Sequence, residues 1–330
     1  MRFGLKQKMV SSFVSAAAAI ILLIGLVVTW KLNEGTDNNA TRIADVVRTN
    51  AEKRIRGHLK IAKISISQFE SKISSQVDLL AKQADVSKFM ENYKLNSLSY
   101  IVRKANETGD VEFGIFFDLE GDILTSFPES QREINLDQQF GELVSGGALR
   151  GVFKSSAATG APGPSETKSS IIRPDAAFVE NFGLNERVAE GTDALAAVSA
   201  TVVLNDYQEP IGFLVLGKFL NGYTAPFEQL NKVTESAFAI YVDGKAVTSA
   251  GFGAGAPELS RNIEEAVAGS AGEQVASLDS NGAMFIASCA PLASKSGNSG
   301  AVICAGVPET EVLSAQNGMV SYLSLIHISE

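Results

Sequence analysis

Histidine, cysteine and tryptophan are scarce in this chain of 330 residues, which contains two histidines, two cysteines and one tryptophan. A structural zinc site needs about four cysteine or histidine ligands, and one of the histidines, His327, stands close to the end of the chain. Two acidic pairs, Asp118 with Asp122 and Glu264 with Glu265, have no histidine or metal cluster beside them to orient a proton transfer. We therefore expect no metal site, no cofactor and no catalytic residue, and the chain is predicted not to be an enzyme.

An excess of positive charge is also missing. The formal net charge is −9, whereas binding to nucleic-acid phosphates needs a concentrated basic surface. Nucleic acid is excluded as a partner.

A long uncharged run is present near the N-terminus. Met9 to Trp30 contains no charged residue, and at 1.5 Å per residue such a helix is long enough for a hydrocarbon core of about 30 Å. A cleaved signal peptide has a shorter apolar stretch of about 7–15 residues. We predict an uncleaved transmembrane helix over 9–31, with Trp30 and Lys31 as its interfacial anchor.

The charges that flank this run predict its orientation. Arg2, Lys6 and Lys8 precede it, and Lys31 alone follows closely. Positive charge is retained on the cytoplasmic side, so residues 1–8 are expected in the cytoplasm and the rest of the chain outside it.

Two cysteines can be oxidised in that location. Cys289 and Cys304 flank a turn-rich run between two apolar runs, so in a hairpin they would face each other. A disulfide and a pair of small buried side chains on neighbouring strands both fit this placement.

The segment from Thr41 to Tyr93 has apolar residues mostly at every third or fourth position and contains no proline. This spacing predicts a long amphipathic helix. A helix of some fifty residues is too long for one globular core, so it is expected to leave the membrane as a stalk, pack on a partner helix in a homodimer, and then back a sheet domain.

Beyond the helix, alternating apolar segments predict two copies of one α+β arrangement. The phrase FGIFFDLEGDILTSF (113–127) matches FAIYVDGKAVTSA (238–250), and IGFLVLGKFL (211–220) matches the run from Ser299 to Glu309. In the first copy a helix is expected near 136–149, a strand at 151–154, and an irregular insertion at 155–193.

This order of elements resembles the double Cache sensor region of bacterial transmembrane receptors, in which two PAS-like modules with antiparallel sheets follow a membrane helix. The resemblance implies the following division of the chain: a helical region at 32–107, a membrane-distal module at 108–222, a membrane-proximal module at 223–308, and the start of an exit helix at 309–330. The chain is expected to end early, because its last residues, from Ser324, resemble translated sequencing-adapter sequence.

The resemblance implies the ligand-sensing half of a chemoreceptor in a bacterial inner membrane, a methyl-accepting chemotaxis protein, that binds a small solute and displaces a helix across the bilayer. A histidine kinase or a cyclic-dinucleotide enzyme with the same outer half is an alternative, and a membrane-anchored structural or adhesion module without a ligand is another. The amino-acid-binding signature of some double Cache domains includes a tryptophan, and the only one here is Trp30. An amino acid is therefore not predicted.

Cationic and aromatic residues of the first copy are the candidates for binding a small, anionic ligand, since a guanidinium can hold a carboxylate bidentately. The insertion at 155–193 would cover such a pocket. The predicted ligand-binding residues are Arg150, Phe153, Lys154, Arg173, Tyr207 and Asp118.

Overall fold

The computed structural model of the chain describes residues 4–107, 111–129, 167–188, 191–253, 255–269, 272–294 and 297–315. The chain divides into two compact units. One unit, residues 52–309, holds all the described strands. The other comprises residues 1–51 and 310–330, of which 4–51 and 310–315 are described and helical. The predicted helix near 136–149 and the predicted strand at 151–154 lie outside the described residues.

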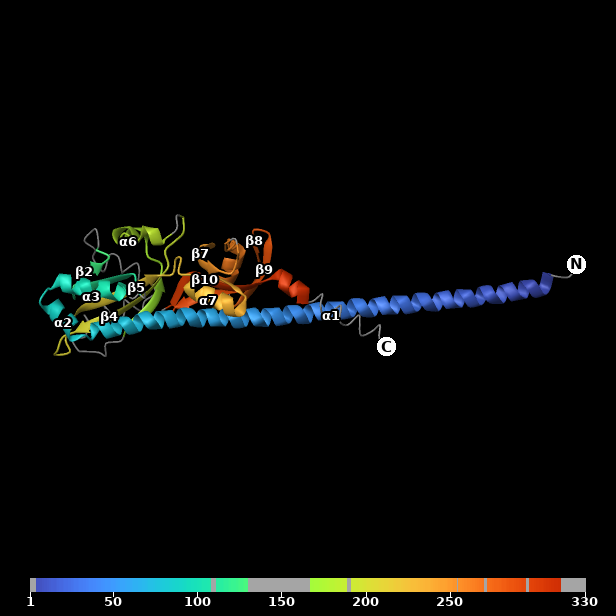
Figure 1. Cartoon of the computed structure of the whole chain (residues 1–330), viewed down its shortest axis with the longest axis horizontal. Coiled ribbons are helices and arrows are strands. Elements are labelled where there is room, and N and C mark those ends of the chain that lie inside the picture. Colours follow the sequence, from blue (N-terminus) through green and yellow to red (C-terminus); the bar gives the residue numbers. More distant parts are fainter. Residues whose placement is uncertain are drawn as a thin grey trace. The chain divides into compact units, whose positions relative to one another are not determined.

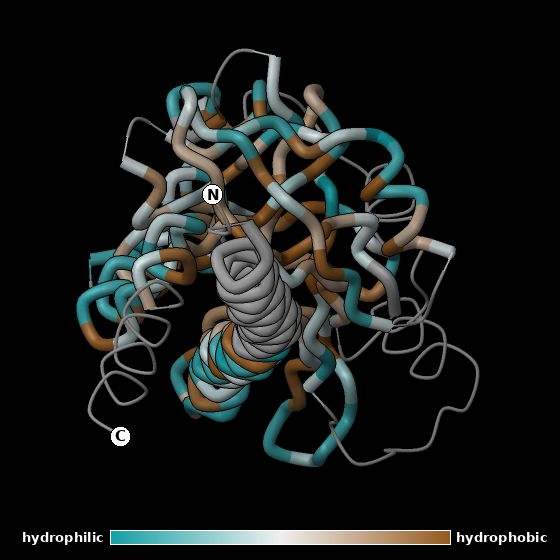
Figure 2. Tube along the Cα trace, turned by 90° about the vertical axis from the view of Figure 1, so that its right-hand side faces the viewer, coloured by the Kyte–Doolittle hydropathy of each residue, from teal (hydrophilic) through white to brown (hydrophobic). Residues whose placement is uncertain are grey.

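The first helix, α1, runs from Gly4 to Ala81. Within residues 52–309 one face of it is buried, as the spacing of its apolar residues predicts, and Figure 2 shows hydrophilic and hydrophobic residues alternating around its described turns. The buried residues of this face include Ile55, Leu59, Ala62, Ile66, Ile73 and Val77. The amphipathic helix is confirmed.

The predicted membrane span lies within the helical backbone of α1, but the side chains of residues 4–41, including those of Trp30 and Lys31, are not among those described. In the described part of the chain, no helix is long and apolar enough to cross a membrane. The transmembrane helix at 9–31 therefore stays a prediction.

The long helix ends earlier than expected. Instead of continuing to Tyr93, α1 stops at Ala81, and two shorter helices follow: α2 (Ala84–Glu91) and α3 (Leu95–Glu107). A straight helix would bring Glu91, five turns after Ile73, onto the buried face and turn Val86 away from it. The extended backbone of Gln83 resets the phase, so that Val86 becomes fully buried.

The first sheet has five antiparallel strands in the order β2-β1-β5-β4-β3. The strands are β1 (Phe113–Phe117), β2 (Ile123–Phe127), β3 (Lys168–Ile172), β4 (Ala196–Leu204) and β5 (Pro210–Phe219). One face packs on α2 and α3: a Cβ atom on Gly212 would lie 2.5 Å from Met90, and one on Gly114 would lie 2.3 Å from Val102. The opposite face is covered by α6 (Ala176–Asn181), and we call it the α6 face.

The insertion predicted to be irregular is partly ordered, so the prediction for 155–193 is wrong for its second half. Strand β3, helix α6 and the 3-10 helix η1 (Asn185–Arg187) all fall within it. The strand was missed because its sequence, KSSII, has two serines, and both are buried against β4 in place of apolar residues.

The second sheet repeats the first in the order β7-β6-β10-β9-β8. Its strands are β6 (Ala237–Val242), β7 (Lys245–Ala250), β8 (Gln274–Ser280), β9 (Ala283–Ser294) and β10 (Gly297–Pro308). One face receives α7 (Ala225–Thr234), where the rings of Phe227 and Phe238 stack at 5.9 Å. The other face packs against α8 (Arg261–Gly269) and is called the α8 face. The α+β class with two antiparallel sheets is confirmed.

Helix α1 runs beside both sheets within residues 52–309 (Figure 1). Next to the second sheet, the imidazole Nδ1 of His58 lies 2.6 Å from the hydroxyl of Ser236, and Arg54 donates to the carbonyl of Thr234. Further along, the ring of Phe69 lies 4.9 Å from that of Tyr223, which follows β5. The helix therefore contacts both repeats along its buried face.

Candidate functional site

The α6 face of the first sheet is apolar where the structure describes it. The ring of Phe113 lies 5.3 Å from that of Phe178 on α6 and 5.7 Å from that of Phe219 on β5. Phe117, Phe182 and further buried residues of β4 and β5 complete this cluster. The described part of the face offers packing for apolar groups rather than hydrogen bonds.

Arg173 stands where β3 ends and joins the two repeats. Its guanidinium forms ion pairs with Asp193, in the segment before β4, and with Asp243, in the tight turn between β6 and β7. Close by, the ammonium of Lys245 donates to the carbonyl of Gly191 at 2.6 Å. We call the contacts made by Arg173 and Lys245 the Arg173 bridge. Together they connect the β6–β7 turn of the second repeat to segment 191–193 of the first.

The bridge also affects the charge of Arg173. Burial opposes the charged form, but the hydrogen bonds and charges of Asp243 and Asp193 outweigh it and raise the pKa of Arg173 above its ordinary value. Because the arginine side chain is always protonated at neutral pH, it is a permanent cation that is shared between two carboxylates.

A groove of about 680 Å³ opens beside the bridge. Arg173, Asp193 and Thr192 line one part of it, and Val179 of α6 and Val188 line another. We call it the Arg173 groove. It combines a cation, hydrogen-bonding groups and apolar surface, the usual composition of a small-molecule site.

Two local hydrogen-bond sets fix the walls of the groove. Asp175 caps α6 by accepting from the backbone N–H of Phe178 at 2.6 Å. Asn221 accepts from the N–H of Leu195 at 2.7 Å and donates to the carbonyl of Asp193 at 3.0 Å. The segment that carries Asp193 is therefore held in place independently of the bridge.

The structure does not bring all the predicted ligand residues together. By the strand register, Asp118 and Tyr207 lie at one end of the first sheet and Arg173 at the other. The Tyr207 side chain is 84% exposed at the tip of the β4–β5 hairpin, and the carboxylate of Asp118 accepts from the N–H of Asp122, which closes the β1–β2 turn. The expectation that these two residues gather with Arg173 is wrong, because β4 separates them by its whole length. Arg150, Phe153 and Lys154 lie outside the described residues.

Cys289 and Cys304 face each other across β9 and β10, and the structure joins them in a disulfide with Cα atoms 4.1 Å apart. Both side chains are fully buried in the cluster on the α8 face. Of the two arrangements that the sequence left open, the structure contains the disulfide. No group of histidine, cysteine, aspartate or glutamate side chains that could hold a metal ion occurs among the described residues.

The sequence did not point to the partners of Arg173. Asp243 followed by Gly244 signals a tight turn, but a turn sequence says nothing of what its carboxylate contacts. Asp193, Lys245 and Asn221 stand in no recognisable motif. Contacts across 70 residues of chain, as between Arg173 and Asp243, follow from tertiary structure alone.

No protein-family model matches the chain, and no curated protein is significantly similar to it. Among solved structures, the sensory domain of the Campylobacter jejuni chemoreceptor Tlp3 (CcmL) matches with a TM-score of 0.50 and 9% identity, covering 82% of this chain and 99% of that one. The Vibrio cholerae LuxQ periplasmic domain matches with a TM-score of 0.45 and 13% identity, covering 77% and 98%. The ligand-binding domain of the Pseudomonas fluorescens chemoreceptor CtaA, in complex with L-serine, matches with a TM-score of 0.44 and 12% identity, covering 80% and 99%. The resemblance to a double Cache sensor region is therefore confirmed at the level of the fold, since the chain is folded like the sensory domain of a chemoreceptor.

Proposed function

We propose that residues 52–309 are the extracytoplasmic ligand-sensing region of a bacterial transmembrane chemoreceptor. The fold of a chemoreceptor sensory domain supports this, together with the uncharged run at 9–30, which continues into the same helix that contacts both sheets. Catalysis, if the whole receptor performs any, would belong to an output domain and not to this region.

The ligand of this proposal is a small solute with an anionic group that binds in the Arg173 groove. Such a group would compete with Asp193 and Asp243 for the guanidinium, which holds carboxylates through two parallel hydrogen bonds. The apolar wall at Val179 and Val188 would take the remainder of the ligand.

The Arg173 bridge is the observation that carries the proposal. The same guanidinium lines the groove and holds the second repeat, so occupancy of the groove would change the contact between the repeats. A change in that contact would move the sheets against α1, and a small displacement of this helix would carry the signal. A homodimer through α1 is part of the proposal, because Ile61 and Ile64 are 43% and 47% exposed on the side of the helix turned away from the sheets.

A thermal-shift screen of the full chain in lipid nanodiscs, against a panel of small carboxylates and phosphorylated metabolites, tests this function. A ligand that binds only the folded state raises the melting temperature. Arg173→Gln should abolish the shift or weaken affinity tenfold or more, as expected when a charged hydrogen bond is lost. The matched control Arg261→Gln, which removes an exposed arginine paired within α8, should keep it. A panel without any shift, or equal shifts in both variants, would contradict the proposed site.

The topology has its own test. A reporter enzyme fused after residue 315 should be active outside the cytoplasm, because the flanking charges favour that orientation. Reporter activity in the cytoplasm would contradict the extracytoplasmic location.

A further inference from the structure

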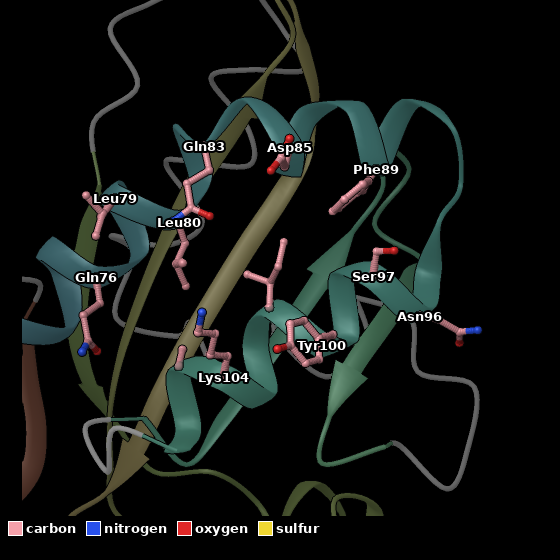
Figure 3. Close-up of a pocket in the computed structure, with 12 residues that line it drawn as sticks. Gln76, Leu79, Leu80, Gln83, Asp85, Phe89, Asn96, Ser97, Tyr100 and Lys104 are labelled. Atoms are coloured by element: carbon pink, nitrogen blue, oxygen red, sulfur yellow. The ribbon is translucent and has the colours of Figure 1, made fainter.

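A second groove, which shares no lining residue with the Arg173 groove, lies between the end of α1 and helices α2 and α3 (Figure 3). Its volume is about 640 Å³, within the range of small-molecule sites. Lining residues come from all three helices, and every one of them belongs to the described part of the chain. We call it the α2–α3 groove.

The middle of this groove is apolar, and the side chains that line it there are not part of the buried core. Helices α2 and α3 anchor themselves to the sheet through other residues: Val86 on α2, and Leu98 and Val102 on α3, are fully buried. Leu80, Phe89 and Ile101 point into the groove instead and are only partly buried. Apolar surface of this kind, gathered in a concave site, is typical of a binding site.

The two walls of the groove carry opposite charges. Figure 3 shows Lys104 and Tyr100 on α3, along one wall, and Asp85 on α2, along the opposite wall. Within the described residues, neither Lys104 nor Asp85 forms an ion pair. Opposite charges on the two sides of an apolar surface are complementary to a molecule that has an apolar middle and opposite charges at its ends.

We propose that the α2–α3 groove binds a short apolar peptide with free termini. The carboxylate of the peptide would meet Lys104 and Tyr100, its ammonium would meet Asp85, and its side chains would cover Leu80, Phe89 and Ile101. A free amino acid carries both charges on one carbon atom, whereas a peptide carries them at its two ends. This site is independent of the proposed function of the Arg173 groove.

Isothermal titration calorimetry of the full chain in nanodiscs with the dipeptide Leu-Phe tests the proposal. Saturable binding is expected, and Lys104→Gln and Asp85→Asn should each weaken it tenfold or more, as expected for a lost charged hydrogen bond. Lys88→Gln is the matched control, because Lys88 is exposed on α2 and does not line the groove; this variant should bind as the unchanged chain does. Arg173→Gln should also leave the dipeptide affinity unchanged, which separates this test from that of the Arg173 groove.

Four results would overturn the proposal. Absence of binding is the first, and equal affinity for the dipeptide with both termini blocked is the second. In the third, octanoate binds and the dipeptide does not, and Lys104→Gln weakens octanoate binding whereas Asp85→Asn leaves it unchanged. The occupant would then be a simple carboxylate with an apolar tail. If Lys104→Gln instead dissociates a dimer in sedimentation and no dipeptide binds, a second copy of the chain occupies the groove, and the peptide is excluded.

Discussion

The two sheets have the same strand order, yet they are filled in different ways. In the first sheet Phe113 faces Gly217 across β1 and β5, and in the second Ala237 faces Gly306 at the corresponding place across β6 and β10. The α6 face is accordingly rich in phenylalanine, whereas the α8 face holds alanines and the two cysteines.

The disulfide has no counterpart in the first sheet. When the Phe113 and Ala237 pairs are matched, Cys304 facing Cys289 corresponds to Val215 facing Ala200. Aromatic rings bury large apolar areas, and a disulfide restricts the unfolded chain instead. One topology can therefore be stabilised by aromatic packing or by a covalent link. The repeat with the bulky aromatic core is also the one with the Arg173 groove.

The largest effect is expected from removing the covalent link. The variant Cys289→Ala/Cys304→Ala opens a loop with a sequence separation of 15, and its free energy of unfolding should fall by about 3 kcal/mol. Urea denaturation of the oxidised proteins measures the loss. Dithiothreitol should destabilise the unchanged chain by a similar amount and leave the variant unaffected; an equal response in both would contradict the role of the disulfide.

A smaller effect is expected from adding one methyl group to each sheet. A Cβ atom at position 217 would lie 2.1 Å from the ring of Phe113, whereas one at position 306 would meet Ala287 at 3.2 Å. Gly217→Ala should therefore cost about 1–3 kcal/mol of unfolding free energy through overpacking, and Gly306→Ala should cost less. Chemical denaturation compares the two variants.

A double-mutant cycle sharpens this comparison. If the clash with the ring is the cause, the cost of Gly217→Ala should shrink when Phe113→Leu is also present. Equal costs for the two glycine variants would mean that the sheets are packed alike at this position.

The link between the repeats should contribute less to stability than either core. Asp193 and Asp243 are 55% and 68% exposed, and exposed ion pairs contribute up to about 1 kcal/mol. Asp243→Asn should lower the unfolding free energy by no more than that, and the difference should shrink in high salt because exposed charges are screened. Urea denaturation at low and high ionic strength checks this. A salt-independent loss of several kcal/mol of unfolding free energy would show that the ion pair between Arg173 and Asp243 is shielded from solvent.

The smallest change is expected at Tyr241, which lies on the α8 face and is fully buried. Its hydroxyl has no hydrogen-bond partner among the described residues, so Tyr241→Phe should leave stability unchanged or raise it by up to about 1 kcal/mol. Tyr207→Phe, at an exposed position, is the control and should have no effect. A loss of more than 1 kcal/mol in Tyr241→Phe would reveal a partner for the hydroxyl.

The ionisation of Tyr241 provides a second measurement. Burial raises its pKa above the ordinary value. The phenol of the unfolded chain ionises near pH 10, so the contribution of this group to stability is complete below about pH 10 and is lost as the pH rises further. Ultraviolet titration near pH 10 should therefore show the same number of ionising tyrosines in the folded unchanged chain as in Tyr241→Phe, because Tyr241 does not ionise there while it is buried.

The sequence by itself determined the class of the fold, because hydrophobic periodicity is a local property. The apolar stripe of α1, the antiparallel strands around Asp243 and Gly244, and the opposition of Cys289 and Cys304 all follow from spacings within a single helix or a single hairpin. The repeat was also visible in the sequence, but the strand register pairs Phe113 with Gly217 and Ala237 with Gly306, which is one residue away from the match between the phrases at 113 and 238. A shift of one residue exchanges the two faces of a strand, and the sequence alone could not detect it.

Only the tertiary structure decided where the chemistry lies. It ended α1 at Ala81 so that Val86 could be buried, and it formed β3 from a segment in which serines occupy buried positions. It also separated Tyr207 and Asp118 from Arg173 and gave the arginine Asp243, a partner from the other repeat. Such contacts depend on how whole sheets are placed. The residue type fixes the charge of a side chain, but only the tertiary structure determines which charges lie next to it.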